Sequence, residues 1–315
     1  MAHDFDGRSW ALILGGSSGF GLATAQKLAE QGMSIAIVHR DRRSVMKTIQ
    51  PEFEKIRGLG VALHTWNTDA VSAEKRELVL DELAQVVGET GRVRVLLHSI
   101  AFGNLKLIAP EKIRERSAPG ALARKLGVDA EELAGAADEL LAEGEDGLAA
   151  VSHAPVYPGR QLLDEDDFSR TIHSMGTSLL GWTQGVFARE LFADDARVFG
   201  LTSEGNTLAW KGYAAVSAAK VSLEALARSI AVEFGPYGVR CNVIQAGITD
   251  TPALRAIPGN LQLKAQARLR NPGGRLTTPR DVANVIYLLA RDEASWINGE
   301  VIRVDGGEHV SGVTP

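Results

Sequence analysis

Tyr213 and Lys220 are the two residues of this chain whose types and spacing could do chemistry together. They stand seven residues apart, and seven steps of about 100° return both side chains to nearly one face of a helix, about 10 Å apart along its axis. A phenol held in this way could polarise a carbonyl oxygen on which negative charge collects. The surrounding stretch 197–250 predicts a strand, a loop, a long helix over 213–234 and another strand.

A glycine-rich turn near the N-terminus could bind a phosphate group. Gly15, Gly19 and Gly21 follow the apolar run 9–14 and precede the amphipathic stretch 22–32. Glycines at this spacing let the backbone turn sharply, admit a pyrophosphate and pack the helix N-terminus against the strand. A strand before the turn and a helix after it predict a dinucleotide site. The other turn residues assigned to this ligand are Ser17, Ser18 and Phe20.

Composition limits the classes of partner. The chain has 315 residues, 45% of them hydrophobic, which is enough for one large α/β domain. Its net charge of −5 gives no electrostatic footprint for nucleic acid or an anionic membrane. The start resembles no signal peptide, no apolar run is long enough to span a bilayer, and the single cysteine, Cys241, cannot form an internal disulfide. We therefore expect a cytoplasmic protein, and we assign no residues to a metal.

Three motifs together resemble one family. The glycine turn, the Tyr213–Lys220 spacing and the run His98–Phe102 (HSIAF) are similar to the short-chain dehydrogenase/reductase superfamily, and specifically to its enoyl-acyl-carrier-protein reductase branch. Ketone-reducing members carry their tyrosine four residues before the lysine, where this chain has Val216. The resemblance implies a single Rossmann-type domain over residues 1–315, with a doubly wound, seven-stranded parallel sheet and helices on both faces.

The resemblance also implies an activity. An enoyl reductase uses NADPH to reduce the carbon–carbon double bond of a trans-2-enoyl thioester on acyl carrier protein or CoA. Tyr213 would then hydrogen-bond the thioester oxygen and stabilise the enolate, and Lys220 would bind the nicotinamide ribose. Ser203, thirteen residues before Val216, could orient the substrate carbonyl or merely cap a turn. Two alternatives stay open: a carbonyl or other double-bond reductase of a specialised metabolite, and a non-catalytic NADP(H)-binding redox sensor.

The second predicted strand ends where an NAD site usually carries an acid for the ribose diol. Arg40 stands near that position, and a guanidinium suits the 2′-phosphate of NADPH, whereas the neighbouring Asp41 keeps NADH as the less favoured option. By resemblance, Asp69 would hold the adenine amino group. Ile248 would reach the nicotinamide carboxamide through its backbone. The other cofactor residues implied are Ser99, Ile100, Ala101 and Thr251, and those implied for the substrate are Phe102 and Trp210.

The segment 104–164 is longer than the resemblance predicts. It contains two helix-like pieces, 119–127 and 129–144, with Asp129 as a candidate cap for the second. Residues 111–146 include five basic and ten acidic side chains, a net charge of −5, which is unfavourable for docking an acidic carrier protein. The segment is either a solvated hairpin beside the pocket or a lid over it.

Two further segments bear on the site. The predicted helix 165–192 has no asparagine around Met175, where many family members carry an active-site asparagine; enoyl reductases also depart from the pattern there. The segment 252–274 is the predicted mobile substrate loop. The family resemblance implies a homodimer or homotetramer assembled through the two long helices.

Overall fold

Seven parallel strands form one sheet in the order β3-β2-β1-β4-β5-β6-β7. The computed structural model describes residues 4–112, 118–157 and 161–312. Strands β1 and β2 are nearly continuous apolar runs, as expected where a parallel sheet is covered on both faces. Their bounds are β1 Ser9–Leu14, β2 Ser34–His39, β3 Leu63–Asn67, β4 Arg92–His98, β5 Phe192–Ser203, β6 Val239–Ala246 and β7 Val301–Val304. The predicted seven-stranded Rossmann-type sheet is confirmed.

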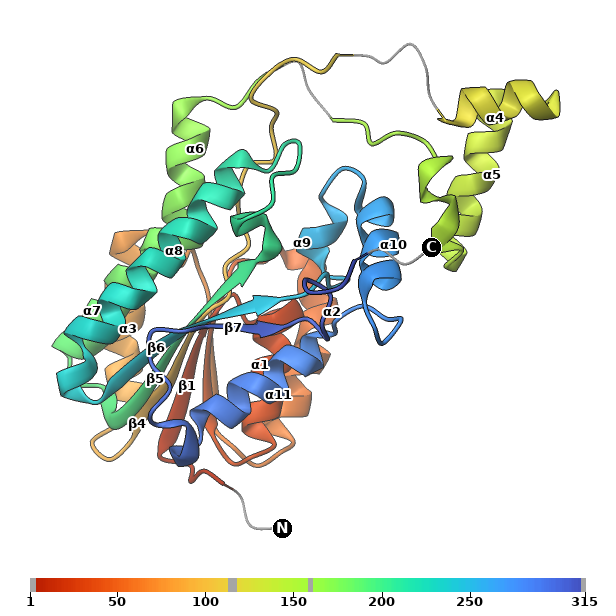
Figure 1. Ribbon diagram of the computed structural model, residues 1–315. Helices are drawn as coiled ribbons and strands as arrows, with labels where there is room; N and C mark the ends of the chain where they lie inside the picture. The colour runs from red at the N-terminus through yellow and green to blue at the C-terminus, as the bar shows by residue number, and fades with distance from the viewer. Residues whose placement is uncertain (1–3, 113–117, 158–160, 313–315) are drawn as a thin grey trace.

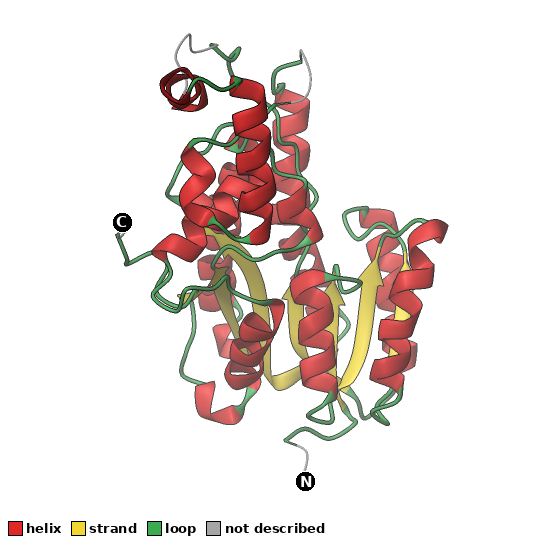
Figure 2. Ribbon diagram, turned by 90° about the vertical axis from the view of Figure 1, so that its right-hand side faces the viewer, coloured by secondary structure: helices red, strands yellow, loops and turns green. Residues whose placement is uncertain are grey.

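Helices cover both faces of this sheet (Figures 1 and 2). The α-helices of the described chain, including some that do not contact the sheet, are α1 Gly19–Ala29, α2 Arg43–Arg57, α3 Ala73–Val87, α4 Ala118–Leu126, α5 Ala130–Glu143, α6 Glu165–Ile172, α7 Ser178–Ala188, α8 Ala214–Glu233, α9 Pro252–Arg255, α10 Asn260–Arg270 and α11 Pro279–Ala290. One buried apolar cluster joins the sheet to α3, α7 and α8, and a second joins it to α1, α2 and α11. Within the described parts of the chain, no helix is both long and apolar enough to cross a bilayer.

The strand order places the functional loops at one edge of the sheet. Strand β1 lies between β2 and β4, so the chain reverses its direction of travel across the sheet at this point. A crevice for ligands opens outside the carboxyl ends of strands at such a switch point. The loops after β1, β4, β5 and β6 begin at Gly15, Ser99, Glu204 and Gly247. The predicted site residues are concentrated in these loops.

The predicted helix over 165–192 is interrupted in the structure. Helix α6 ends at Ile172, a π-helical turn spans His173–Thr177, and α7 ends at Ala188, because β5 already begins at Phe192. The Ser174 hydroxyl donates to the Phe102 carbonyl, and a Cβ at Gly176 would lie 2.7 Å from the carbonyl oxygen of α8 residue Ala219. The close packing of this turn against α8 and the loop after β4 accompanies the local departure from regular α-helix.

The inserted segment is a helical hairpin docked on the predicted substrate loop. Asp129 accepts hydrogen bonds from the backbone N–H groups of Glu131 and Glu132, so the predicted cap of α5 is confirmed. The buried stripe of α5 consists of Ala134, Ala137 and Leu141, whereas Leu140 is exposed. This helix packs on α4, α10 and the turn 146–150, and periodicity alone cannot identify these partners.

Polar contacts hold this hairpin to α10. The Arg268 guanidinium donates to the Asp146 carboxylate at 2.7 Å, and both side chains are mostly buried. The Gln262 amide donates to the Ser152 hydroxyl and to the His153 carbonyl at 2.9 and 3.0 Å. Figure 1 shows α4 and α5 projecting beside α10, at a distance from the sheet. The insertion is thus tied to the segment 252–274 and not to the strands.

We predict that Asp146→Ala loosens this docking. The change leaves the mostly buried Arg268 charge without its partner, which costs about 1–3 kcal/mol of local stability. Hydrogen exchange should become faster for backbone amides in 130–152, while amides of the sheet keep their protection. The matched control is Asp166→Ala, which removes an exposed ion pair with Arg170 and should change neither region. Equal loss of protection across the whole protein would contradict this local role.

Candidate active site

The loop after β1 approaches the end of β4 so closely that only glycine fits. Gly15 has a φ of +85°, and a Cβ there would lie 2.5 Å from the Ser99 carbonyl oxygen. A Cβ at Gly21 would lie 2.2 Å from the Gly15 carbonyl oxygen, so α1 packs directly on the loop. Ser18 caps α1 without a side-chain hydrogen bond to its first N–H groups. A helix N-terminus with free N–H groups beside a glycine loop fits a pyrophosphate.

A cavity of about 460 Å³ lies over this loop. It is lined by residues from the loops after β1, β2, β3 and β4 and from the start of α9. The predicted cofactor residues that it brings together are Gly15, Ser17, Ser18, Gly19, Phe20, Arg40, Asp69, Ser99, Ile100, Ala101 and Thr251. Gly21 lies behind the loop as a packing residue. The donors and shape of this cavity fit the adenosine and diphosphate part of a dinucleotide.

Arg40 extends over this cavity, and Asp41 does not line it. The Arg40 guanidinium lies 3.1 Å from the Asp69 carboxylate, and its central carbon is 4.5 Å from the centre of the Phe102 ring. Asp41 lies 2.8 Å from the ring nitrogen of buried His39, and its backbone N–H donates to the Asn67 side chain. An acid held in this way is poorly placed for a ribose diol, whereas a cation stands at the cavity.

Phe102 is not where the predicted substrate role requires it. It lies in the cavity of Arg40 and Asp69, and it does not line the cavity that contains Tyr213. Its ring packs on the guanidinium of Arg40, which follows β2. Sequence position placed Phe102 correctly in the loop after β4 but could not decide on which side of the loop the ring would lie.

A second cavity of about 230 Å³ continues from the first. The two share Phe20, Ser99, Ile100, Ala101 and Thr251, so one elongated ligand could occupy both. The other predicted site residues in this second cavity are Ser203, Trp210, Tyr213, Lys220 and Ile248. We call it the catalytic cavity because it contains the tyrosine and the lysine.

Tyr213 and Ser203 face each other in the catalytic cavity. Their hydroxyl oxygens are 3.4 Å apart, and the Trp210 ring packs edge-on against the Tyr213 ring with centroids 5.6 Å apart. Burial raises the pKa of the Tyr213 phenol, and the contact with Ser203 opposes this only partly. The phenol is therefore protonated at neutral pH and can donate a hydrogen bond. The sequence predicted that Tyr213 would be the first residue of the helix, but in the structure it is the N-cap residue that precedes α8.

Val216 takes the position one turn before Lys220. It packs with Met175 and Ala219 in a small apolar cluster, and a Cβ at Gly103 would lie 3.1 Å from its side chain. This wall of the catalytic cavity has no proton donor. A ligand bound beside Val216 would contact apolar side chains there. The Tyr213 phenol would contact the ligand from the N-terminal end of α8.

Lys220 is buried at the floor of the catalytic cavity. Its ammonium donates to the Leu201 carbonyl at 2.9 Å, and burial lowers its pKa to about 8, with Glu224 acting in the opposite direction. Glu224 also accepts hydrogen bonds from Thr202 and Asn206 at 2.5 and 2.6 Å. The lysine is thus held by the end of β5, and its ammonium can donate to a ligand hydroxyl.

His98 anchors the loop after β4 and does not line either cavity. It is buried, and its ring nitrogen lies 2.8 Å from the Ser178 hydroxyl of α7. Burial, with a smaller effect of the Lys220 charge, lowers the pKa of His98 to about 3. The ring is therefore neutral at pH 7 and fixes the position of residues 99–103. Ser178, its partner, was not identified from the sequence, because it lies 80 residues away.

A charged cluster at the far end of the catalytic cavity was also missed. The Arg270 guanidinium binds Glu204 at 2.7 Å and Glu308 at 2.9 Å. The second oxygen of Glu308 accepts from the Ile248 backbone N–H at 3.1 Å, and burial raises the pKa of this carboxyl. Ile248 was predicted to contact the nicotinamide carboxamide, so that role requires Glu308 to release the N–H. No local pattern marks Glu308, whose importance depends on contacts 38 and 60 residues away.

Comparison with known proteins gives the same family for both halves of the chain. A family model described as short chain dehydrogenase matches residues 9–115, and one described as Enoyl-(Acyl carrier protein) reductase matches residues 128–309. A curated relative, 1-cyclohexenylcarbonyl-CoA reductase from Streptomyces collinus, is 24% identical, over 96% of this chain and 87% of its own length.

Solved structures agree in fold. A short-chain dehydrogenase from Burkholderia cenocepacia J2315 in complex with NADP has a TM-score of 0.68 at 20% identity, and covers 98% of this chain and 100% of that one. An enoyl-(acyl-carrier-protein) reductase from Anaplasma phagocytophilum in complex with NAD has a TM-score of 0.69 at 20% identity, and covers 100% and 96%. The chain belongs to the short-chain dehydrogenase/reductase family and is an NAD(P)H-dependent oxidoreductase.

Proposed function

We propose that the protein reduces the carbon–carbon double bond of a trans-2-enoyl thioester with NADPH. The observation that carries this is the pairing of a protonated Tyr213 phenol with the apolar Val216 wall in the catalytic cavity. A ketone reductase needs a proton donor at the oxygen of the carbon that receives hydride. Here the donor lies one turn away, as suits a thioester oxygen that is separated by two carbons from the β-carbon that receives hydride. The enoyl reductase family model and the cyclohexenylcarbonyl-CoA relative support the same substrate class.

The residues of the catalytic cavity would share the work. The cofactor supplies the hydride when it is bound. Tyr213 donates a hydrogen bond to the thioester oxygen, where negative charge collects as the β-carbon is reduced. Ser203, 3.4 Å from the phenol, orients it toward that oxygen. Lys220 binds the ribose hydroxyls next to the nicotinamide, since its buried ammonium lies beside the Leu201 carbonyl with donors to spare.

NADPH is the proposed cofactor because of the charge at the adenosine end. Arg40 stands at the cavity and can bind a 2′-phosphate, while Asp41 is engaged with His39. We further propose that the protein works in the cytoplasm as a homodimer or homotetramer. The acidic insertion is a poor surface for an acidic carrier protein, so CoA thioesters are the first substrates to try.

The decisive assay follows NADPH oxidation with crotonyl-CoA and, separately, acetoacetyl-CoA. We expect turnover of the enoyl thioester and none of the keto thioester. Tyr213→Phe should lower kcat by about 10²- to 10³-fold, as expected when one hydrogen bond to a developing oxyanion is lost, and should leave NADPH affinity unchanged. Turnover of acetoacetyl-CoA alone would replace this proposal with a carbonyl reductase. NADPH binding without turnover of either compound would favour a redox sensor.

We predict that Arg40→Leu weakens the binding of NADPH but not that of NADH. Loss of a charge-assisted contact to the 2′-phosphate should raise its KM by roughly 10- to 100-fold, because such contacts contribute about 1.5–3 kcal/mol. The KM for NADH should change little. Arg42→Leu is the matched control, since Arg42 is exposed and does not line the cavity. An equal effect of both variants, or of Arg40→Leu on both cofactors, would argue against a 2′-phosphate site.

Cofactor affinity should also depend on pH through Lys220. Its folded-state pKa of about 8 means that the ammonium is present at neutral pH and is lost as the pH rises through that value. The Kd for NADPH, measured by fluorescence, should therefore rise between about pH 7 and about pH 9, because a neutral amine is a weaker donor to the ribose. Lys220→Met should bind NADPH weakly and with a flat pH profile. If the Kd of the wild type were as independent of pH as that of Lys220→Met, Lys220 would not be part of the binding site.

A further inference from the structure

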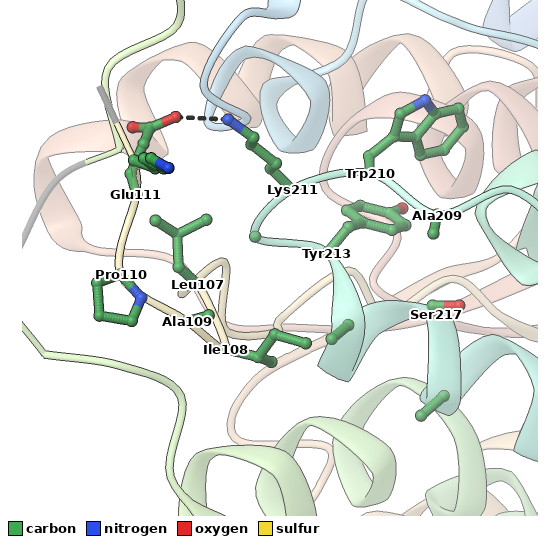
Figure 3. A pocket seen from close by; sticks show the side chains of 14 residues that line it. Leu107, Ile108, Ala109, Pro110, Glu111, Ala209, Trp210, Lys211, Tyr213 and Ser217 are labelled. Atoms are coloured by element: carbon green, nitrogen blue, oxygen red, sulfur yellow. Dashed lines mark hydrogen bonds and ion pairs between the residues drawn. The ribbon is translucent and has the colours of Figure 1, made fainter. Parts of the chain in front are cut away.

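A second opening adjoins Tyr213 on the side away from the cofactor cavity. Residues 107–112 of the insertion form one wall, and residues 209–214 with the first turn of α8 form the other (Figure 3). The space between them is about 1290 Å³. We call it the outer groove. Trp210 and Tyr213 belong both to this groove and to the catalytic cavity, so the two spaces meet at the phenol.

The walls of the outer groove are mainly apolar. Leu107, Ile108, Ala109 and Pro110 face Trp210 and the Tyr213 ring across it (Figure 3). Ala209, Ala214 and Ala218 add to this apolar surface, and Ser217 and Lys112 are polar members of the lining. Ile108 is 70% exposed to solvent although it lies among apolar neighbours. Exposed apolar surface of this kind, continuous with a catalytic cavity, is characteristic of a binding groove.

The insertion is held in place as a wall of this groove. The Lys211 ammonium lies 2.7 Å from the Glu111 carboxylate across the rim. A Cβ at Gly212 would lie 3.2 Å from the ring of Tyr157, which belongs to the returning part of the insertion. The Glu111–Lys211 pair is electrically neutral, and Lys112 adds one positive charge to the same rim. An apolar occupant is therefore favoured by the walls below the rim and not by the rim itself.

The volumes of the catalytic cavity and the outer groove indicate which part of the substrate each of them could hold. The catalytic cavity of about 230 Å³ is smaller than the range of roughly 300–1,000 Å³ usual for small-molecule sites. It must hold the nicotinamide and the reacting double bond, which leaves little room for a long or ring-bearing acyl group. The outer groove begins at the phenol that binds the thioester oxygen, and it has the missing volume.

We propose that the outer groove binds the hydrocarbon part of the acyl group, and that the enzyme prefers enoyl thioesters with medium-length or ring-bearing acyl groups over short ones. This assignment rests on the proposed reductase function and deepens it by naming the substrate class. The insertion supplies the wall 107–110 and so creates a specificity element of this chain. The pantetheine arm of the thioester leaves the site by another path, because the wall 107–110, with Ala209, Ala214 and Ala218, offers no side-chain partner to its two amides.

The test compares crotonyl-CoA with trans-2-octenoyl-CoA. Wild-type kcat/KM should be higher for the octenoyl thioester by about tenfold or more, since each methylene buried in an apolar site adds to binding. Ala109→Trp fills the groove and Ile108→Asp makes its wall polar, and both positions are exposed, so folding is spared. Each variant should remove most of the octenoyl preference and leave crotonyl-CoA within about twofold. Leu126→Trp, on an exposed residue of α4 outside the groove, is the matched control and should change neither substrate.

Other outcomes separate this inference from the function beneath it. Reduction of crotonyl-CoA with no chain-length preference, or equal loss of both substrates in Ala109→Trp, would overturn the groove assignment while leaving the reductase intact. If Ala109→Trp abolished the reduction of every CoA thioester but still reduced short N-acetylcysteamine thioesters, the groove would be assigned to the pantetheine arm instead. If no enoyl thioester is reduced, the proposed function fails. Calorimetry with octanoyl-CoA and butyryl-CoA would then still test the assignment of the groove to the acyl group. Tighter binding of octanoyl-CoA that is lost in Ala109→Trp would support the assignment, and equal binding of the two compounds would reject it.

Discussion

The close approach of the loop after β1 to the end of β4 is the constraint on which the site depends. A side chain at Gly15 would collide with the Ser99 carbonyl, and one at Gly21 would collide with Gly15 itself. The backbone contact brings the N-terminus of α1 against the sheet at its switch point. Both cavities are built from loops that follow neighbouring strands, so their relative positions are determined by the sheet order.

Burial controls the protonation states around the catalytic cavity. It raises the pKa of the Tyr213 phenol, lowers that of Lys220 to about 8, and keeps His98 neutral with a pKa of about 3. The same physical cause thus gives a protonated hydrogen-bond donor, a titratable cation and a neutral structural ring within one small volume. Glu308 is a fourth case, a carboxyl whose pKa is raised by burial and which is held by Arg270. Chemistry at this site would therefore be more sensitive to changes in solvent access than to surface charge.

The insertion changes the surroundings of a common sheet. Its helices α4 and α5 contribute no strand to the sheet and are held to α10 through Asp146 and Arg268. Its first residues, 107–112, form a wall beside Tyr213, and Tyr157 packs on Gly212. An added segment that contacts both the substrate loop and the loop before α8 can alter which ligands enter while the cofactor side stays unchanged. This separation is typical of enzymes in which loops on a rigid scaffold carry specificity.

The sequence by itself determined the features that depend on local pattern. Apolar runs predicted β1 and the strands on either side of α8, the glycine spacing predicted the turn before α1, and Asp129 predicted the start of α5. Local chemistry is sufficient there because hydrophobic period, glycine backbone freedom and helix capping act over a few residues. The total of seven strands was implied by the family resemblance.

Only the tertiary structure decided the features that depend on contacts between distant segments. It placed Tyr213 at the cap of α8, turned Phe102 toward Arg40, set Glu308 on the Ile248 N–H and docked the insertion on α10. Each of the last three arrangements joins residues about 60 or more positions apart. Periodicity carries no information on such pairings, because they arise from how whole elements pack and not from the preference of any one residue.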